Sequence, residues 1–182
     1  MVELAIRALK SVWHRGAIDA DGKTGDGAGI LMQMPDPFLR NAAKQAGFTL
    51  PPAGEYGVAF TFLPSDKEIK ANKEKAEACR RALEKIAAEE GQTVLGWRDV
   101  PVNSDAIGWL AQSTEPAMAQ LFIGRGKTDA AAFERKMYVI RRRAERWAAT
   151  EGAAHSAGFA IASCSSRTLI YKGMLKPDQV EA

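Results

Sequence analysis

Three glycines at alternate positions, Gly25, Gly27 and Gly29, constrain the fold of this chain more than any other feature. Glycine has no side chain to bury, so this spacing does not serve to fill a core. It is used where the backbone takes a positive φ or closely approaches another group. The loop opens with Trp13-His14-Arg15-Gly16-Ala17 and leads into an apolar run over 28–34. Two interpretations remain open: a tight turn that enters a strand, or the wall of a binding site.

Composition places the chain among ordinary globular proteins and excludes several classes. Its 182 residues suit one domain or a large part of one, and 46% of them are hydrophobic. The net charge of +3 is too small to argue for nucleic-acid binding, and the basic run 141–143 falls in a helical pattern that favours a solvated face. No apolar run is long enough to span a membrane, so we expect no membrane partner. Two cysteines are too few for a disulfide framework, so we expect a cytoplasmic protein.

Hydrophobic periodicity predicts alternating helices and strands. Residues 103–115 are expected to be irregular or a short helix. The order of the predicted helices and strands along the chain is typical of a layered α/β or α+β domain. The predicted helices cover 2–13, 36–46, about 65–90 and a long segment after 128, and the predicted strands cover 28–34, 56–63, 93–100, 117–123, 159–164 and 168–171.

Local signals predict where the helices begin and end. Ser65 and Glu68 have the spacing of a capping box, which would begin the helix that runs to about residue 90. Thr128 is placed to cap the last long helix. Gly47 and Gly91 follow helical segments where a glycine commonly ends a helix. The run 28–34 is continuously apolar apart from one residue, which predicts a buried strand.

The glycine loop does not match a known phosphate-binding motif. A dinucleotide fingerprint needs a strand before its glycines and a helix after them, whereas here the strand follows. A Walker loop is excluded on the same ground, because a helix should follow its Lys-Ser/Thr pair, whereas Lys23-Thr24 leads into the predicted strand. An unrelated nucleotide-binding α/β domain is therefore only a third, weaker hypothesis.

The charged residues of the loop allow more than one role. His14 could act as a general base, but a lone histidine beside an arginine more often structures a loop. Arg15 could hold a carboxylate or lower the pKa of a neighbouring group. It could equally form a structural ion pair with Asp19, Asp21 or Asp26. The residues alone do not decide between these roles.

The two cysteines are too few for a disulfide framework or a metal site. Cys79 falls on the apolar face of a charged helix and is expected in the core. Cys164 ends a predicted strand, where a buried position is favoured over a nucleophile because a nucleophile needs a base beside it. We therefore predict no catalytic residue and no metal ligand within the chain.

Four blocks in order along the chain resemble the N-terminal class II glutamine amidotransferase domain of the glutamate synthase large subunit. The likeness covers most of the chain and is specific because the blocks occur in the family's order. The blocks are Trp13-His14-Arg15-Gly16-Ala17 with Thr24-Gly25-Asp26-Gly27-Ala28-Gly29, Val94-Leu95-Gly96-Trp97-Arg98-Asp99-Val100-Pro101, Phe133-Glu134-Arg135-Lys136-Met137-Tyr138, and Ser165-Ser166-Arg167-Thr168 with Tyr171-Lys172-Gly173-Met174-Leu175.

The resemblance implies an α+β fold of the N-terminal-nucleophile (Ntn) hydrolase type. In that fold two helical layers enclose two stacked sheets, in the four-layer order αββα. It implies hydrolysis of glutamine, with the ammonia passed to a synthase domain that makes glutamate from 2-oxoglutarate using FMN and an iron–sulfur cluster. The family's nucleophile is an N-terminal cysteine activated by its own α-amino group. By the resemblance, Arg15 corresponds to the family arginine near that nucleophile.

The chain departs from the family pattern because no cysteine precedes Cys79. We expect residues 1–182 to be a partial domain that lacks the opening strand and the C-terminal half. The resemblance then leaves a site wall without its nucleophile, and we predict a partial glutaminase domain, inactive alone, whose partners are glutamine and the rest of a glutamate synthase. The alternative is a non-catalytic interaction module that docks on a synthase subunit. The predicted wall comprises His14, Arg15, Gly16, Gly25, Asp26 and Gly27.

Overall fold

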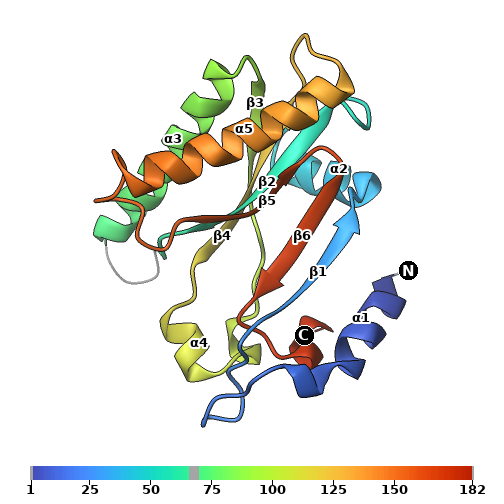
Figure 1. The fold of residues 1–182 in the computed structure, drawn as a ribbon, viewed down its shortest axis with the longest axis vertical. Coiled ribbons are helices and arrows are strands. Elements are labelled where there is room, and N and C mark those ends of the chain that lie inside the picture. Colours follow the sequence, from blue (N-terminus) through green and yellow to red (C-terminus); the bar gives the residue numbers. More distant parts are fainter. Residues whose placement is uncertain (1, 66–69, 182) are drawn as a thin grey trace. The chain divides into compact units, whose positions relative to one another are not determined.

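The computed structural model describes residues 2–65 and 70–181, and Figure 1 shows how helices and strands alternate along them. The helices are α1 (Val2–Ser11), α2 (Asp36–Gln45), α3 (Lys70–Glu89), α4 (Trp109–Ser113) and α5 (Ala130–Ala149). The strands are β1 (Ala28–Gln33), β2 (Tyr56–Leu63), β3 (Thr93–Asp99), β4 (Ala117–Gly124), β5 (Ala160–Ser165) and β6 (Thr168–Gly173). Short 3₁₀ turns cover Trp13–Arg15, Ser104–Ala106 and Pro177–Glu181.

Two compact units make up the chain. The small unit comprises Met1–Leu31, Pro101–Glu115 and Ile170–Ala182, and the large unit comprises Met32–Val100 and Pro116–Leu169. The large unit therefore contains the long helices α3 and α5 with the strands between them, whereas the small unit contains the glycine loop, α1 and α4.

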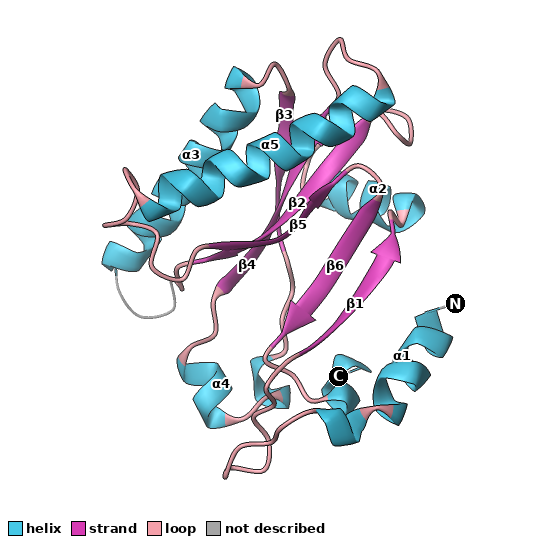
Figure 2. Ribbon diagram, viewed as in Figure 1, coloured by secondary structure: helices cyan, strands magenta, loops and turns pink. Residues whose placement is uncertain are grey.

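Four strands of the large unit form an antiparallel sheet in the order β3-β4-β2-β5 (Figure 2). β2 pairs with β4 along its whole length, from Tyr56 opposite Gly124 to Leu63 opposite Ala117. Nearly every residue of β2 is buried. Burial on both faces explains why this strand has a continuous run of aromatic and apolar residues rather than an alternating pattern.

Helices α3 and α5 cover one face of this sheet (Figure 1). The apolar stripes predicted from helical spacing are buried, with Leu83 in α3 and Met137 in α5 fully inaccessible to solvent. They pack against strand residues such as Ala59, Leu121 and Ile123. Leu121 and Ile123 point to the same face because they alternate along β4, and Ala59 shares that face because it lies opposite Leu121.

The opposite face of the sheet receives α2. Phe122 contacts Phe48, which follows α2, with ring centroids 5.2 Å apart in an edge-to-face arrangement. The hydroxyl of Tyr56 donates to the Asp36 carboxylate at the start of α2 over 2.9 Å, and Arg40 donates to the same carboxylate oxygen over 2.8 Å. One carboxylate thus fixes the first turn of α2 to the sheet.

The basic run in α5 is paired rather than free. Arg143 donates to Glu90 at the end of α3 over 2.7 Å, and Lys136 donates to the other oxygen of Glu90 over 2.6 Å. Arg141 and Arg142 both pair with Glu145 on their own helix. The run therefore ties α5 to α3 and stabilises α5 itself, by amounts that are modest for exposed pairs.

Strands β1 and β6 form a separate two-stranded sheet. The strands are antiparallel, because Gly29 lies against Lys172 while Met34 donates its N–H to the Arg167 carbonyl. The sequence predicts a buried strand here, and that prediction is wrong in one respect. β1 alternates between more and less accessible residues, and Leu31 is 64% exposed. The reason is that only one face of β1 is covered.

Helix ends follow the predicted signals in part. Gly47 and Gly91 have φ values of +88° and +75° and end α2 and α3 as predicted. Thr128 was predicted to cap α5, but the cap is Asp129, whose carboxylate accepts the Ala132 N–H over 2.8 Å. The Thr128 hydroxyl is buried without a hydrogen-bond partner. Asp129 is one residue closer to the helix than Thr128. Its negative carboxylate can accept a free N–H of the first turn and interacts favourably with the helix dipole.

Two further predictions concern segments at the ends of helices. The helix predicted over 2–13 ends at Ser11 and continues as the 3₁₀ turn Trp13–Arg15. The capping box of Ser65 and Glu68 lies outside the described residues, because the structure does not describe 66–69. The α+β class is confirmed, since helices accompany two antiparallel sheets.

Candidate functional site

The predicted site loop folds as a small antiparallel hairpin in the small unit. Ile18 and Gly25 form a β-bridge, and the Asp19 N–H donates to the Thr24 carbonyl over 2.9 Å. Gly22 completes the turn with a φ of +69°, a conformation that glycine adopts without strain. The segment between the His-Arg pair and the glycines is therefore ordered by its own backbone hydrogen bonds.

The Asp21 carboxylate organises the turn of this hairpin. It accepts the backbone N–H groups of Lys23 over 2.8 Å and Thr24 over 2.7 Å, and the Thr24 hydroxyl over 2.6 Å. These bonds, led by the one from the Thr24 hydroxyl, lower the pKa of Asp21 to about 2. Asp21 is thus charged at neutral pH and engaged in the turn.

Two further segments of the small unit hold the hairpin in place. A Cβ added at Gly108, just before α4, would lie 2.3 Å from the Asp21 carboxylate, so only glycine allows this approach. The side-chain amide of Gln179 donates to the carbonyl of Lys23 over 2.9 Å and to that of Ala106 over 2.8 Å. One side chain therefore ties together three segments that are distant in sequence.

Packing within the chain accounts for the alternating glycines. A Cβ at Gly25 would lie 2.5 Å from the backbone of Leu175, and one at Gly29 would lie 2.6 Å from the Lys172 Cβ. Gly27 has a φ of +136°. Both predicted reasons for glycine, close approach and positive φ, are confirmed. The group that approaches Gly25 and Gly29 belongs to this chain, which supports the interpretation of a turn that enters a strand; the site wall stays a prediction.

The His-Arg pair lies on the 3₁₀ turn that precedes the hairpin, and both side chains are exposed. Within the described part of the chain, no ion pair joins Arg15 to any of the three aspartates of the loop, so the structural ion pair considered above is not formed. The Asp26 carboxylate lies 3.2 Å from where a Cβ on Gly16 would be. The structure thus brings Gly16 and Asp26 together and leaves the Arg15 guanidinium in solvent.

Neither cysteine is an accessible thiol. Cys79 in α3 and Cys164 in β5 are both buried and unpaired. Burial raises the pKa of Cys79 to about 11 and that of Cys164 to about 12. Because the thiolate is the nucleophilic form, burial and a raised pKa both disfavour these thiols as nucleophiles near neutral pH. The prediction that both are core cysteines is confirmed.

One polar cluster of the large unit was not predicted. The Glu134 carboxylate accepts the Ser165 hydroxyl over 2.6 Å, and the Ser166 N–H and hydroxyl over 2.8 and 2.5 Å. Burial raises the pKa of Glu134, but these hydrogen bonds outweigh burial and the net pKa is lowered. The cluster fixes the turn between β5 and β6 to α5. Its signal was present in the sequence, since both partners fall in blocks that carry the resemblance.

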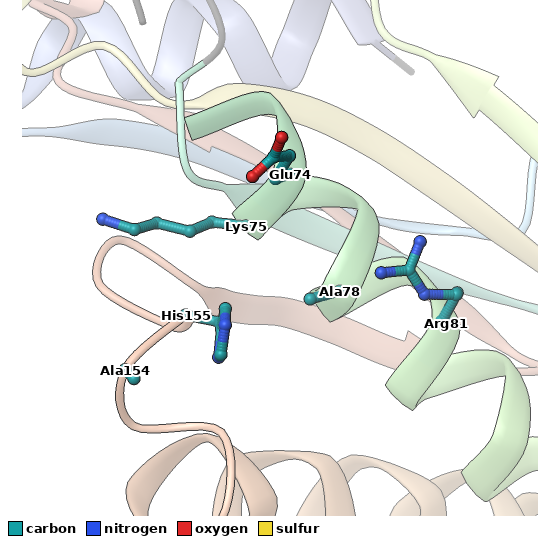
Figure 3. A pocket seen from close by; sticks show the side chains of 6 residues that line it. All are labelled: Glu74, Lys75, Ala78, Arg81, Ala154 and His155. Carbon is teal, nitrogen blue, oxygen red and sulfur yellow. The ribbon is translucent and has the colours of Figure 1, made fainter. Parts of the chain in front are cut away.

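A surface pocket in the large unit lies between α3 and the turn before β5 (Figure 3). It includes the second histidine of the chain but none of the predicted site residues. The backbone carbonyl of this histidine accepts the buried Cys79 thiol over 3.6 Å. The residues that line it are Glu74, Lys75, Ala78, Arg81, Ala154 and His155.

Residues 2–65 and 70–181 contain neither a candidate metal centre nor a candidate membrane span. No group of three or more His, Cys, Asp or Glu side chains there is arranged to hold a metal ion. None of the helices in this part of the chain is both long and apolar enough to cross a membrane.

Comparison with known proteins assigns the family. The model of the class-II glutamine amidotransferases matches residues 1–182. The glutamate synthase [NADPH] large chain of Bacillus subtilis (strain 168) is 43% identical over 100% of this chain, and that of Azospirillum brasilense is 41% identical over 99%. The chloroplastic ferredoxin-dependent glutamate synthase of Oryza sativa subsp. japonica is 36% identical over 98%. The chain spans only 11% of the length of each of these relatives.

These matches agree with the fold. Two antiparallel sheets combined with helices are consistent with the N-terminal-nucleophile type of fold implied by the sequence blocks. The match extends over the whole chain, including the glycine loop and the Glu134 cluster. This chain belongs to the class-II glutamine amidotransferases.

Proposed function

We propose that residues 1–182 form part of the glutaminase domain of a glutamate synthase. In the complete enzyme, glutamine would be hydrolysed and its ammonia used to make glutamate from 2-oxoglutarate. The observation that carries this proposal is the Arg15 guanidinium: it is exposed, it has no ion pair with the loop's aspartates, and it sits beside a hairpin fixed by Asp21 and Gln179. The family description supplies glutamine, the names of the relatives supply glutamate synthesis, and 2-oxoglutarate is what the resemblance implies.

The role of this chain in that reaction is to form a wall of the glutamine site. Arg15 would stabilise a negative charge, either a thiolate or the carboxylate of glutamine, because a guanidinium is always charged and donates in a planar fork. His14 and Gly16 flank it in sequence. On the other arm of the hairpin, Gly25 bridges Ile18 and the Asp26 N–H donates to the Ala17 carbonyl over 3.2 Å, and Gly27 follows them. The rigid hairpin would hold this wall in one geometry.

The attacking thiol would come from polypeptide other than these residues. The family's nucleophile is an N-terminal cysteine whose own α-amino group accepts the thiol proton. Cys79 and Cys164 cannot take that part, because both are buried and their pKa values are raised. We therefore propose that the 182 residues alone do not hydrolyse glutamine.

FMN and an iron–sulfur cluster would bind elsewhere in the complete enzyme. A cluster of this kind is held by cysteine thiolates, commonly four, and the two cysteines here are buried in different elements. The glycine loop does not provide a phosphate cradle either, because Leu175 and Lys172 already occupy the faces of Gly25 and Gly29. The residues present do not fit these groups.

Unpaired cysteines favour a cytoplasmic location.

A chimera tests this proposal. The segment of the Bacillus subtilis large chain that aligns with this chain would be replaced by residues 1–182, and ammonia release from glutamine would be measured. We expect activity in the chimera and a loss of about 10²–10³-fold in kcat with Arg15→Ala, the size of effect seen when one electrostatic stabiliser is removed. Arg15→Lys should recover part of it.

The matched control is Arg7→Ala, because Arg7 is also an exposed arginine of the small unit. That variant should keep the parent kcat. An Arg15→Ala chimera with unchanged kcat and an unchanged pH profile would refute the role of Arg15.

A further inference from the structure

The pocket between α3 and the turn before β5 is not used by the proposed function. It has a volume of about 430 Å³, and pockets that hold small molecules start at about 300 Å³. Lys75 and Arg81 contribute cations to its lining and His155 contributes an imidazole. Glu74 is the one carboxylate among the described residues that line it. A lining of this kind suits a small charged ligand rather than an apolar one.

Helical spacing explains why there is a hollow on this face of α3. Glu74, Ala78 and Arg81 are four and three residues apart, so their side chains follow one row along the helix. Ala78, in the middle of the row, has only a methyl group and leaves the space that a longer side chain would fill. Figure 3 shows His155 and Arg81 on either side of Ala78. The small residue therefore opens a hollow that polar groups surround.

Hydrogen bonds hold the second wall of the pocket against α3. The buried Cys79 thiol donates to the His155 carbonyl over 3.6 Å, which joins the backbone of the turn to the helix. The His155 N–H donates to the Gly152 carbonyl over 2.8 Å, and the Ser156 hydroxyl donates to the Ala148 carbonyl over 2.7 Å. Because the turn is already ordered, a ligand does not have to order it on binding.

The two cations of the pocket are not neutralised by ion pairs. Within the described parts of the chain, neither Lys75 nor Arg81 pairs with a carboxylate. Arg80, the direct neighbour of Arg81, does so: it pairs with Asp99 over 2.5 Å. A guanidinium can bind a carboxylate through two parallel hydrogen bonds, and an ammonium binds one as a point charge. Both cations are thus available to a ligand that carries carboxylates.

We propose that this pocket binds a small amino acid with an acidic side chain. Such a ligand carries two carboxylates and one ammonium group, and the lining offers the opposite set: cations at Lys75 and Arg81 and an anion at Glu74. Lys75 and Arg81 are six residues apart, which separates their Cα atoms by about 9 Å along the helix axis. Cations set apart in this way suit two separate carboxylates better than one compact anion. The His155 imidazole adds a polar contact from the facing wall.

The inference does not depend on the glutaminase role of the small unit. All six residues that line the pocket belong to the large unit, and none of them is in the predicted wall. The chimera and its Arg15 variants therefore decide the proposed function, and ligand binding at the pocket is measured separately.

The imidazole signals in NMR spectra of the purified 182-residue chain test the proposal. The chain has two histidines, so His155 reports on the pocket and His14 reports on the small unit. Titration with glutamate at low ionic strength, where charges are least screened, should shift the His155 signal in a saturable way and leave the His14 signal unchanged. Arg81→Ala removes a charge-assisted contact and should weaken glutamate binding by about ten-fold or more.

Two analogues of glutamate separate the contacts. Glutarate lacks the ammonium group, and glutamine lacks one carboxylate. Both should bind the parent chain more weakly than glutamate does. Glu74→Gln should weaken the binding of glutamate several-fold without weakening that of glutarate, because only glutamate has an ammonium group for Glu74 to accept. The matched control is Lys85→Ala, because Lys85 lies on the same helix outside the pocket and pairs with Glu89. This variant should bind glutamate as the parent does.

No saturable shift of the His155 signal, equal shifts of both histidines, or parent-like binding by Arg81→Ala would each overturn the inference. Glutarate that binds the parent chain as tightly as glutamate would overturn it too. A shift of the His14 signal alone would indicate that glutamate binds at the candidate site, which supports the proposed function and refutes the pocket. A saturable His155 shift together with an inactive chimera would support the pocket while the proposed function fails.

Discussion

Substituting Gly25 by alanine should loosen the hairpin of the small unit. The added Cβ would lie 2.5 Å from the backbone carbon and oxygen of Leu175. Side-chain carbons do not come this close to other atoms, and neither partner is the end of a flexible side chain, so the backbone itself must move. The φ of Gly25 is not positive, so alanine fits the backbone conformation and only the overlap is tested.

The change in the free energy of local opening follows from two opposing effects. Overpacking a close contact costs about 1–3 kcal/mol. Alanine also restricts the unfolded chain more than glycine does, which offsets about 0.4–1 kcal/mol. A net loss of about 1–2 kcal/mol raises the equilibrium for local opening by about 5–30-fold, since 1.4 kcal/mol is a factor of ten.

Hydrogen exchange followed by mass spectrometry measures this opening directly. Peptides covering the hairpin at 17–26 and its neighbour at 171–176 should exchange faster in Gly25→Ala, while β2 in the large unit should be unaffected. Gly16→Ala is the matched control, because Gly16 has a φ of −95°. Its Cβ would lie 3.2 Å from the flexible end of Asp26 and at an ordinary contact distance of 3.6 Å from the Trp13 carbonyl oxygen. Parent-like protection of the hairpin in Gly25→Ala would refute the packing explanation of the glycines.

Two further predictions address the polar clusters. Glu134→Ala leaves the Ser165 and Ser166 donors without their acceptor and should lower the free energy of unfolding by about 2 kcal/mol in urea titrations. Glu145→Ala, which removes only surface ion pairs, should lower it by less than about 1 kcal/mol. Asp21 has its pKa lowered from 3.8 to about 2, so it stabilises the hairpin fully above pH 4, and this contribution is lost as the pH falls through 2. Asp21→Asn should remove this acid transition from the hairpin's amide exchange while Asp19→Asn should not, and an unchanged transition in Asp21→Asn would contradict the assignment.

Much of the large unit could be predicted because its signals are local. The aromatic and apolar run of β2 identifies a strand with both faces covered, and its bounds Tyr56–Leu63 are those predicted. The stripes of α3 and α5 follow from a repeat of three or four residues. Each of these features depends on residues within one segment, so no knowledge of the partner segment was needed.

Features that depend on distant segments were missed. The exposure of Leu31 depends on which face of β1 is covered, and a continuous apolar run does not contain that information. Glu134 and Ser166 are 32 residues apart, and neither residue type alone marks a contact. Thr128 and Asp129 both suit a helix cap, so only the observed backbone decides between them.

In the candidate site, too, features that depend on local sequence could be predicted, and contacts with distant segments could not. The resemblance identified its residues, and the need for glycine at 25, 27 and 29 followed from backbone chemistry. The identity of the approaching group did not, because Leu175 lies far from Gly25 in sequence and only the fold brings them together. The role of Gln179 was missed for the same reason, since it donates to the carbonyls of Lys23 and Ala106. The role of Asp21 was missed although its partners Lys23 and Thr24 are close in sequence, because an aspartate in a turn commonly accepts such local bonds and the sequence offers three aspartates there.

Glutamine hydrolysis by the purified 182-residue chain tests the central claim most directly. The claim is that these residues supply a site wall while the attacking sulfur comes from elsewhere, because Cys79 and Cys164 are buried with raised pKa values. Ammonia release, followed by mass spectrometry of the glutamate formed, should not exceed the rate without protein, and Cys164→Ala should leave it unchanged. Turnover that is abolished by Cys164→Ala would contradict the claim.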